Sequence, residues 1–280
     1  MSQLKALFKI SRPLSTLSGV FAVLLGGYIA GGIPEQWGKV ALAALATLLV
    51  SASANAWNDY LDIEIDKINQ PKRPLPAGLI SPRAVVIFSI SFAVLSLIIA
   101  LFINPLAFGV VLVSNALLYV YSWKLKSTVL FGNATVAAIS ALSAIFGGVA
   151  VENIRPTFWI ALTIGLAIMG REILKTLADY EGDLHEHCRT IATVWGRKPA
   201  RIFFYILLAA TLIVMFISFF KQGYHPIYAY IVAFGVYPVA LYILMTVSRE
   251  RTGPQLEKLS QIFKYDFFVW FLAVFLGAAV

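Results

Sequence analysis

Two short acidic clusters are the part of this sequence whose residue types and spacing could do chemistry. The chain holds 14 aspartates and glutamates, and nine of them lie in two connections between long apolar runs. The first cluster contains Asp59, Asp62, Glu64 and Asp66. The second contains Glu172, Asp179, Glu181, Asp183 and Glu186.

A spacing of four residues recurs in both clusters. Asn58, Asp62 and Asp66 are four apart, and Lys175 precedes an Asp179–Asp183 pair with the same spacing. If each apolar helix continues into its cluster, these side chains lie on one helix face, where like charges repel. A divalent cation removes that repulsion, and hard oxygen ligands that leave room for phosphate oxygens suit Mg²⁺. A single pair of acidic residues four positions apart is usually just solvated. Two such pairs at matching helix ends, each beside basic residues, favour a functional site.

Basic residues beside the clusters suit a phosphate ligand. Arg73 follows the first cluster in "QPKRPLPAG", where the prolines stiffen the turn, and a guanidinium can bind phosphate with two hydrogen bonds. We expect Lys126, Lys175 and Arg12, which precedes Pro13, to approach the same space. The alternative for each is an ordinary membrane anchor, which is the favoured interpretation for Lys5, Lys9 and Arg83. Carboxylates, Mg²⁺ and cations together indicate a diphosphate site.

The elements that must position these residues are membrane helices. Of the 280 residues, 60% are hydrophobic and only 13% are charged, which excludes an ordinary soluble domain. Backbone groups in lipid must pair internally, so apolar runs of about 20 residues predict helices. The expected fold is one all-α integral membrane domain over residues 1–280. Its nine transmembrane helices are expected at 14–32, 38–58, 83–102, 105–123, 129–151, 156–174, 201–220, 226–247 and 266–280, the last being the shortest.

The net charge of +8 does not indicate nucleic-acid binding, because the basic residues gather on one side of the expected membrane spans. Of the 22 lysines and arginines, all but Lys39, Arg155 and Lys221 fall on one side of the nine expected spans. The positive-inside rule then predicts a cell-membrane protein with its N-terminus and both acidic clusters in the cytoplasm and its C-terminus outside. The single cysteine, Cys188, excludes an internal disulfide framework.

With these motifs, the chain resembles the UbiA-type membrane prenyltransferases over almost its whole length. The family's first motif, NDxxDxxxD, is matched by Asn58, Asp59, Asp62 and Asp66, followed by "RPLPAG". Its second motif, DxxxD, is matched by "DYEGD", residues 179–183. Within the family, "REILKTLADYEGD" and "GNATVA" look most like the enzymes that attach a geranylgeranyl group to geranylgeranylglyceryl phosphate. The chain departs from that subfamily at Thr176 and Ala178, where acidic residues are usual, and in "TIA" at 190–192, where "TLP" is usual.

The resemblance implies a UbiA-type bundle with a central cavity, Mg²⁺ as cofactor and ionisation of a prenyl diphosphate. The resemblance implies that Asn58, Asp62 and Asp66 bind one metal ion and that Asp179 and Asp183 bind a second. The four aspartates among them are the implied catalytic residues. The diphosphate-binding residues implied are Arg73, Lys126, Lys175, Arg12 and Tyr121. Aromatic faces attract cations, so Tyr119 and Tyr121 are candidates to face a prenyl cation. The implied partners are a prenyl diphosphate, a membrane-associated acceptor and the lipid bilayer.

Two alternatives remain open at this point. The same machinery could prenylate an aromatic or chlorin acceptor of the 4-hydroxybenzoate, naphthoate or chlorophyllide type. More remotely, two acidic helix ends separated by 117 positions could mark internal repeats of a cation-coupled transporter. Transporters place such charges near the bilayer midplane, whereas these gather at one face, so the pattern favours the enzyme. A covalent product distinguishes the two classes.

Overall fold

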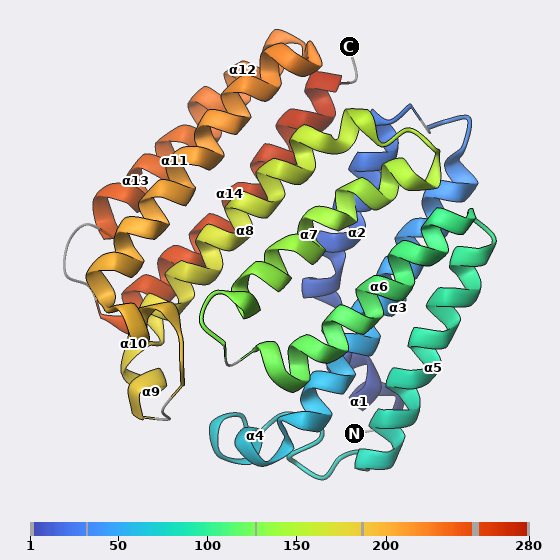
Figure 1. Ribbon diagram of the computed structural model, residues 1–280, viewed down its shortest axis with the longest axis vertical. Helices are drawn as coiled ribbons and strands as arrows, with labels where there is room; N and C mark the ends of the chain where they lie inside the picture. Colours follow the sequence, from blue (N-terminus) through green and yellow to red (C-terminus); the bar gives the residue numbers. More distant parts are fainter. Residues whose placement is uncertain (1–2, 32, 127, 186–187, 248–251, 279–280) are drawn as a thin grey trace. The chain divides into compact units, whose positions relative to one another are not determined.

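All regular secondary structure in the described part of the chain is helical. The computed structural model describes residues 3–31, 33–126, 128–185, 188–247 and 252–278, and no strand occurs among them. Glu186, predicted in the second acidic cluster, lies outside these residues. The chain divides into two compact units, residues 1–126 with 142–157 and residues 127–141 with 158–280, and helix α7 contributes to both (Figure 1).

Apolar helices form at all nine predicted runs. Within the described ranges, eight helical segments are long and apolar enough to cross a bilayer. They are α3 (Trp37–Leu61), α5 (Pro82–Leu101), α6 (Pro105–Val120) with η1 (Tyr121–Leu125), α7 (Phe131–Ala150), η2 (Arg155–Thr157) with α8 (Phe158–Ala178), α11 (Arg197–Gln222), α12 (Pro226–Ile231) with η3 (Val232–Val236) and α13 (Tyr237–Val247), and α14 (Gly253–Ala278). The first predicted run is α2 (Pro13–Ile29), whose apolar part, Thr16–Ile29, is shorter. The all-α membrane fold is therefore confirmed.

The last helix differs from its prediction, because α14 begins at Gly253 rather than near residue 266. Hydropathy alone placed the boundary too late, since charged residues occur between 257 and 264. Leu256, Leu259, Phe263 and Trp270 recur at helical spacing and are buried. The first half of α14 is therefore amphipathic, and its packing decides where it starts.

Local sequence signals place several helix starts. Ser81 and Asn104 accept hydrogen bonds from the backbone N–H groups of Ala84 (3.2 Å) and Ala107 (2.7 Å), and a proline follows each cap. Capping of this kind satisfies an N–H group that has no partner within the helix, and proline fits the first helical position. These caps therefore set where α5 and α6 begin.

In the first unit, α3 packs against α2, α5 and α6. The α2–α7 contact depends on glycines, because a Cβ at Gly26 would lie 2.0 Å from the carbonyl oxygen of Ala144. A Cβ at Gly147 would lie 2.2 Å from the carbonyl oxygen of Val23. The two backbones therefore touch directly, and these glycines allow the close helix packing. The short helix α1 (Gln3–Ile10) packs the buried Ala6 and Ile10 into the same unit.

In the second unit, α8 packs against α11 and α14 around a core that includes Leu174, Phe204, Ile243 and Phe263. Two short helices, α9 (Tyr180–His185) and α10 (Ile191–Trp195), connect α8 to α11. Thr190 caps α10 by accepting a hydrogen bond from the backbone N–H of Thr193 at 3.3 Å. The described part of the connection between α8 and α11 thus contains two short helices joined by non-helical residues.

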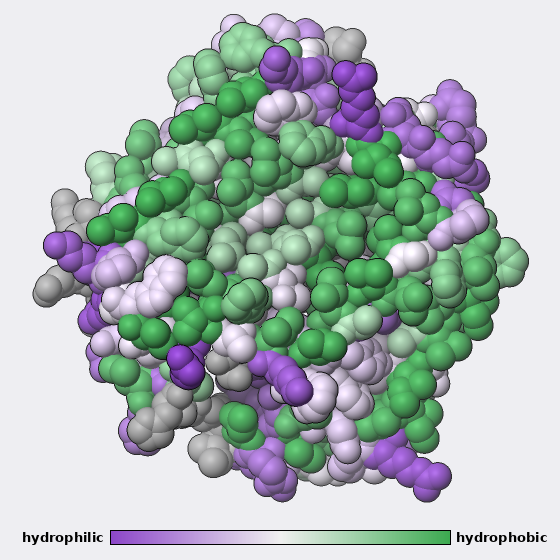
Figure 2. Space-filling view, viewed as in Figure 1, coloured by the Kyte–Doolittle hydropathy of each residue, from purple (hydrophilic) through white to green (hydrophobic). Residues whose placement is uncertain are grey.

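Outward helix faces carry apolar side chains in place of charged ones. On α5, Ile87, Ile90, Val94 and Leu101 are each about half exposed, from 48% to 62%. Figure 2 shows hydrophobic residues covering the side of the first unit where α5 lies. Contiguous apolar surface on helices long enough to span a bilayer is a lipid-facing surface. The chain is a multi-pass membrane protein.

Candidate active site

The first acidic cluster lies where α3 passes into α4 (Ile63–Asn69), with Asp62 between the two helices. The backbone N–H of Asp62 donates to the carbonyl of Asn58 at 2.9 Å, and that of Asp66 donates to the carbonyl of Asp62 at 2.8 Å. The i to i−4 hydrogen bonds therefore continue through the junction. This confirms that the helix extends beyond the apolar run, with a local break at Asp62.

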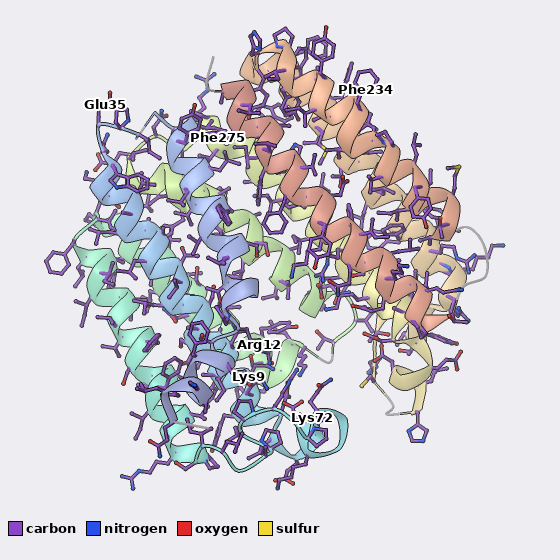
Figure 3. The ribbon with its side chains drawn as sticks, turned by 180° about the vertical axis from the view of Figure 1, so that it is seen from behind. Lys9, Arg12, Glu35, Lys72, Phe234 and Phe275 are labelled. Atoms are coloured by element: carbon purple, nitrogen blue, oxygen red, sulfur yellow. The ribbon has the colours of Figure 1, made fainter. Side chains whose placement is uncertain are left out.

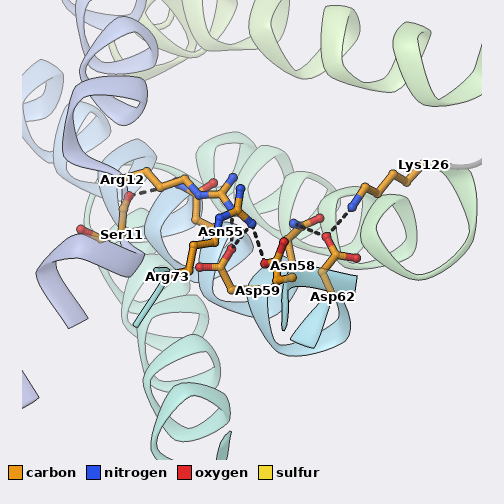
Figure 4. Close-up of polar contacts among 9 residues, drawn as sticks. Ser11, Arg12, Asn55, Asn58, Asp59, Asp62, Arg73 and Lys126 are labelled. Carbon is orange, nitrogen blue, oxygen red and sulfur yellow. Dashed lines mark hydrogen bonds and ion pairs between the residues drawn. The ribbon is translucent and has the colours of Figure 1, made fainter. Parts of the chain in front are cut away.

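Each carboxylate of this junction has a cationic partner (Figure 4). Asp62 accepts from Lys126 and from the side-chain amide of Asn58, the latter at 2.8 Å. Asp66 accepts from Arg73 at 2.6 Å. The junction thus brings together Asn58, Asp62, Asp66, Arg73 and Lys126, all predicted from the sequence as site residues.

Asp59 lies beside these residues, although it was not predicted as a metal ligand or phosphate-binding residue. Only 2% of its surface is exposed, and it forms an ion pair with Arg12 and a second with Arg73 at 3.5 Å. The signal that could have found it was present, because Asp59 lies inside the NDxxDxxxD motif. A buried carboxylate needs a charged partner, and Arg12 is a suitable one.

Arg12 is held in place by its backbone. It occupies the turn between α1 and α2 with φ 48° and ψ 60°, the left-handed region that non-glycine residues seldom adopt. Its carbonyl accepts from the backbone N–H of Thr16 at 3.2 Å, and Asn55 donates to the neighbouring carbonyl of Ser11 at 3.0 Å. These contacts fix the turn against α3, so the guanidinium reaches Asp59.

The three cationic side chains pair with the three carboxylates and remain partly exposed to solvent. The side chains of Arg12, Arg73 and Lys126 are 33%, 31% and 45% exposed, whereas those of Asp59 and Asp66 are 3% and 7% exposed. Figure 3 shows Arg12 at the same end of the first unit as Lys9 and Lys72, with Glu35 at the opposite end. An anion that reaches this end of the unit meets cations, with the carboxylates behind them.

The second acidic cluster repeats the local architecture of the first. Helix α8 ends at Ala178, Asp179 stands between α8 and α9, and the backbone hydrogen bonds continue across the junction. The N–H of Asp179 donates to the carbonyl of Lys175 at 2.9 Å, and that of Asp183 donates to the carbonyl of Asp179 at 2.8 Å. The matched spacing in the sequence therefore reflects a matched break in the helix.

The charges around Asp179 differ from those in the first cluster. Lys175 pairs with Glu172 at 3.3 Å. Burial raises the pKa of Asp179 above its usual value of 3.8, and this effect outweighs the lowering by the nearby Lys175. Glu257 and Glu172 raise that pKa further. Nearby carboxylates and removal from water both disfavour the ionised form of Asp179, and a cation beside it would offset both effects.

The two candidate tyrosines occupy different environments. Tyr121 opens the π-helical turn η1, and its carbonyl accepts from the backbone N–H of Lys126 at 2.9 Å, so this turn sets the position of Lys126. Tyr119 hydrogen-bonds through its hydroxyl to Ser53 at 3.0 Å and to Ser89 at 2.6 Å. Tyr119 thereby ties α6 to α3 and α5, while Tyr121 belongs to the turn that presents the lysine.

The donor atoms fit a hard divalent cation. Among the described residues, no three His, Cys, Asp or Glu side chains gather closely enough to hold a metal ion by themselves. The first junction instead offers the oxygens of Asp62 and Asp66 beside the amide of Asn58. Mg²⁺ is usually held by one or two carboxylates, with waters and substrate phosphates as its other ligands. The residues present fit Mg²⁺ bound together with a phosphorylated ligand.

These features define a multi-pass helical membrane protein with two acidic helix junctions, the first of them lined by cations. The chain belongs to the UbiA prenyltransferase family, whose pattern matches residues 19–274. The chain is 31% identical to digeranylgeranylglyceryl phosphate synthase of Thermococcus kodakarensis over 99% of each chain. It is 34% identical to the enzyme of that name from Pyrococcus horikoshii, over 98% of this chain and 97% of the relative.

Solved structures share the fold. A structure of digeranylgeranylglyceryl phosphate synthase superposes with a TM-score of 0.84 at 28% identity, covering 99% of both chains. A UbiA homologue from Archaeoglobus fulgidus, bound to GPP and Mg²⁺, gives a TM-score of 0.68 at 20% identity over 95% of this chain and 99% of the other. The family predicted from the two motifs and the helical pattern is therefore confirmed.

Proposed function

We propose that this chain transfers a geranylgeranyl group from geranylgeranyl diphosphate to the free hydroxyl of geranylgeranylglyceryl phosphate. The observation that carries the proposal is the set of cations held against the acids of the first junction, because it suits a diphosphate bound with a metal. The relatives named above support the choice of acceptor, since they match this chain along almost its whole length.

The proposal assigns roles to the residues of both junctions. Asn58, Asp62 and Asp66 would hold one Mg²⁺, and Asp179 and Asp183 would hold a second. When bound, Mg²⁺ supplies positive charge that makes the diphosphate a better leaving group. Asp62, Asp66, Asp179 and Asp183 are the catalytic carboxylates of this scheme. The solved relative with GPP and Mg²⁺ supports a metal of this kind.

The cations of the first junction stabilise the departing diphosphate. Arg12, Arg73 and Lys126 contact carboxylates and are partly exposed, so each can also donate to phosphate oxygens. Arginine suits this role, because its planar fork binds two phosphate oxygens at once. Lys175 serves in the same way beside the second junction. Charge stabilisation of this kind is commonly the largest single contribution to catalysis.

The transfer exchanges one carbon–oxygen bond for another. The bond between the allylic carbon and the diphosphate breaks, and its electron pair leaves with the diphosphate. The acceptor hydroxyl then forms the ether bond to that carbon and gives its proton to a nearby carboxylate or water. Tyr121 offers an aromatic face to the transient prenyl cation, and the helices exclude bulk water.

The proposal also includes the placement of the site. The whole chain, residues 1–280, is proposed to form a single membrane domain. The N-terminus and both junctions lie on the cytoplasmic side, supported by the excess of lysine and arginine at that side of the spans. The prenyl tail then lies among the helices or in lipid, while the diphosphate stays at the polar end.

A product assay tests the proposal. Purified protein receives Mg²⁺, geranylgeranyl diphosphate and, in separate reactions, geranylgeranylglyceryl phosphate, 4-hydroxybenzoate, a naphthoate and chlorophyllide, and the products are identified by mass spectrometry. We expect an ether product with the lipid phosphate only, and none from Asp62→Asn or Asp183→Asn. A prenylated aromatic or chlorin product alone would reassign the acceptor. No covalent product with any acceptor would favour the transporter class.

A further inference from the structure

A cavity in the second unit has no role in the proposed chemistry. It has a volume of about 580 Å³ and is lined by the first turn of α11, by α9 and by the start of α14. Arg197, Lys198 and Arg201 enter it from α11, and Tyr180 and Glu181 enter it from α9. We infer that this cavity binds the phosphate group of the acceptor lipid.

The charge of the cavity matches a phosphate monoester. Among the described residues that line it, three side chains are cationic and Glu181 is anionic. Glu181 is 84% exposed and lies 4.0 Å from Arg197, so it screens the cations only weakly. The remaining positive charge complements a phosphate monoester, which carries a charge of about −1.5 to −2 at neutral pH.

The position of these cations on α11 favours an anion close to them. The first turn of a helix carries a partial positive charge, so acidic residues are favoured there and basic ones are not. The first turn of this 26-residue helix has no acidic residue, and Arg197 and Arg201 stand four apart on one face. A phosphate in the cavity would offset this unfavourable arrangement of charge.

The cavity lies beside the second junction, where the start of α14 contacts the end of α8. A Cβ at Gly253 would lie 2.5 Å from the carbonyl oxygen of Ala178, so α14 begins in close contact with the end of α8. The guanidinium of Arg197 lies 5.3 Å from the centre of the Tyr180 ring, within the range of a cation–π contact. Leu177 and Ala178 add an apolar wall. Both Tyr180 and Ala178 adjoin Asp179, so an anion here lies next to the second acidic motif in the chain.

The donor diphosphate is a less suitable occupant. In the proposed scheme it needs several carboxylates that hold metal ions, whereas the lining of this cavity offers one carboxylate, the exposed Glu181. A phosphate monoester that is not transferred needs cations alone. This inference rests on the proposed function, because it assigns one end of the acceptor in that reaction.

The test compares two acceptors that differ only in the phosphate, geranylgeranylglyceryl phosphate and geranylgeranylglycerol. For the double variant Arg197→Gln/Arg201→Gln, we expect the KM for the phosphorylated acceptor to rise about 100-fold, about tenfold for each guanidinium removed. The KM for geranylgeranyl diphosphate and the activity with geranylgeranylglycerol should stay unchanged. Arg83→Gln, an exposed arginine of the first unit, is the matched control and should leave all three unchanged.

A second variant shifts binding in the opposite direction. Glu181→Gln removes the carboxylate of the cavity and should lower the KM for the phosphorylated acceptor. Inorganic phosphate should compete with that acceptor in the wild type and lose this effect in the double variant. An unchanged acceptor KM in the double variant would overturn the inference. Equal losses with both acceptors, or a rise in the KM for the diphosphate, would do the same, because they indicate a membrane-anchoring or donor-site role.

A binding measurement separates this inference from the proposed function. Labelled geranylgeranylglyceryl phosphate is added to wild type and to the double variant in uncharged detergent, without the diphosphate. Weaker binding by the double variant supports the cavity even if the wild type makes no ether product, a result that would reject the proposed function alone. Equal binding by both proteins rejects the cavity even if the ether product forms.

Discussion

Replacing Asp59 with asparagine tests whether this buried carboxylate positions the diphosphate-binding arginines. Arg12 makes an ion pair with Asp59, whereas Arg73 also contacts Asp66 at 2.6 Å and keeps that contact in the variant. The change therefore acts mainly on Arg12. We expect it to weaken diphosphate binding while the acceptor site stays intact.

The structure sets the size of the effect. Breaking a fully buried ion pair costs about 3–5 kcal/mol, and an exposed pair is worth about 0–1 kcal/mol. Asp59 is buried but the Arg12 side chain is 33% exposed, so an intermediate loss of about 2 kcal/mol is reasonable. If that loss falls on the bound state, the KM for the diphosphate rises about 30-fold.

Steady-state kinetics with varied geranylgeranyl diphosphate measure this effect. The KM for the diphosphate should rise, the KM for the acceptor should not, and Asp59→Glu should restore part of the loss because it keeps the charge. Glu64→Gln is the matched control, since Glu64 is 77% exposed and pairs with Lys67 at the surface. A normal diphosphate KM in a folded Asp59→Asn protein would refute the positioning role.

Three further predictions concern other residues. Lys126→Ala should raise the diphosphate KM about tenfold because it removes one cation that binds phosphate, and an unchanged value would remove Lys126 from the site. Gly26→Ala should lower the thermal midpoint strongly in a detergent melt, because its Cβ would meet the Ala144 carbonyl at 2.0 Å, whereas Gly38→Ala has open space and should not. Tyr119→Phe should lower the free energy of unfolding by about 1–2 kcal/mol, because it removes two hydrogen bonds to buried serines. It should leave the KM for the diphosphate unchanged, and a change in that KM would point to a role at the site.

Much of the fold was predictable because its rules are local. Apolar length predicts the spans, and Asn104-Pro105 combines a cap with a first-turn proline, so the boundary between α5 and α6 follows from the sequence. The four-residue spacing of Asn58, Asp62 and Asp66 likewise predicts a helical junction. Each of these inferences concerns residues a few positions apart.

The features that the sequence did not predict depend on contacts between distant residues. Arg12 and Asp59 are 47 positions apart, and Asp62 and Lys126 are 64 apart. The sequence indicates that these cations suit phosphate, but which carboxylate each one meets depends on the left-handed turn at Arg12 and on the π-helical turn before Lys126. The start of α14 was placed wrongly for a related reason, since its first half is stabilised by packing.

The central claim is that each acidic junction holds a metal ion needed for diphosphate binding, and a manganese titration tests it most directly. Mn²⁺ replaces Mg²⁺, and the number of ions bound per chain is counted by electron paramagnetic resonance with and without geranylgeranyl diphosphate. We predict that the diphosphate increases the number bound, and that Asp62→Asn and Asp183→Asn each lower it and weaken diphosphate binding. If either variant binds as many ions and as much diphosphate as the wild type, that junction does not hold the metal and the account is wrong.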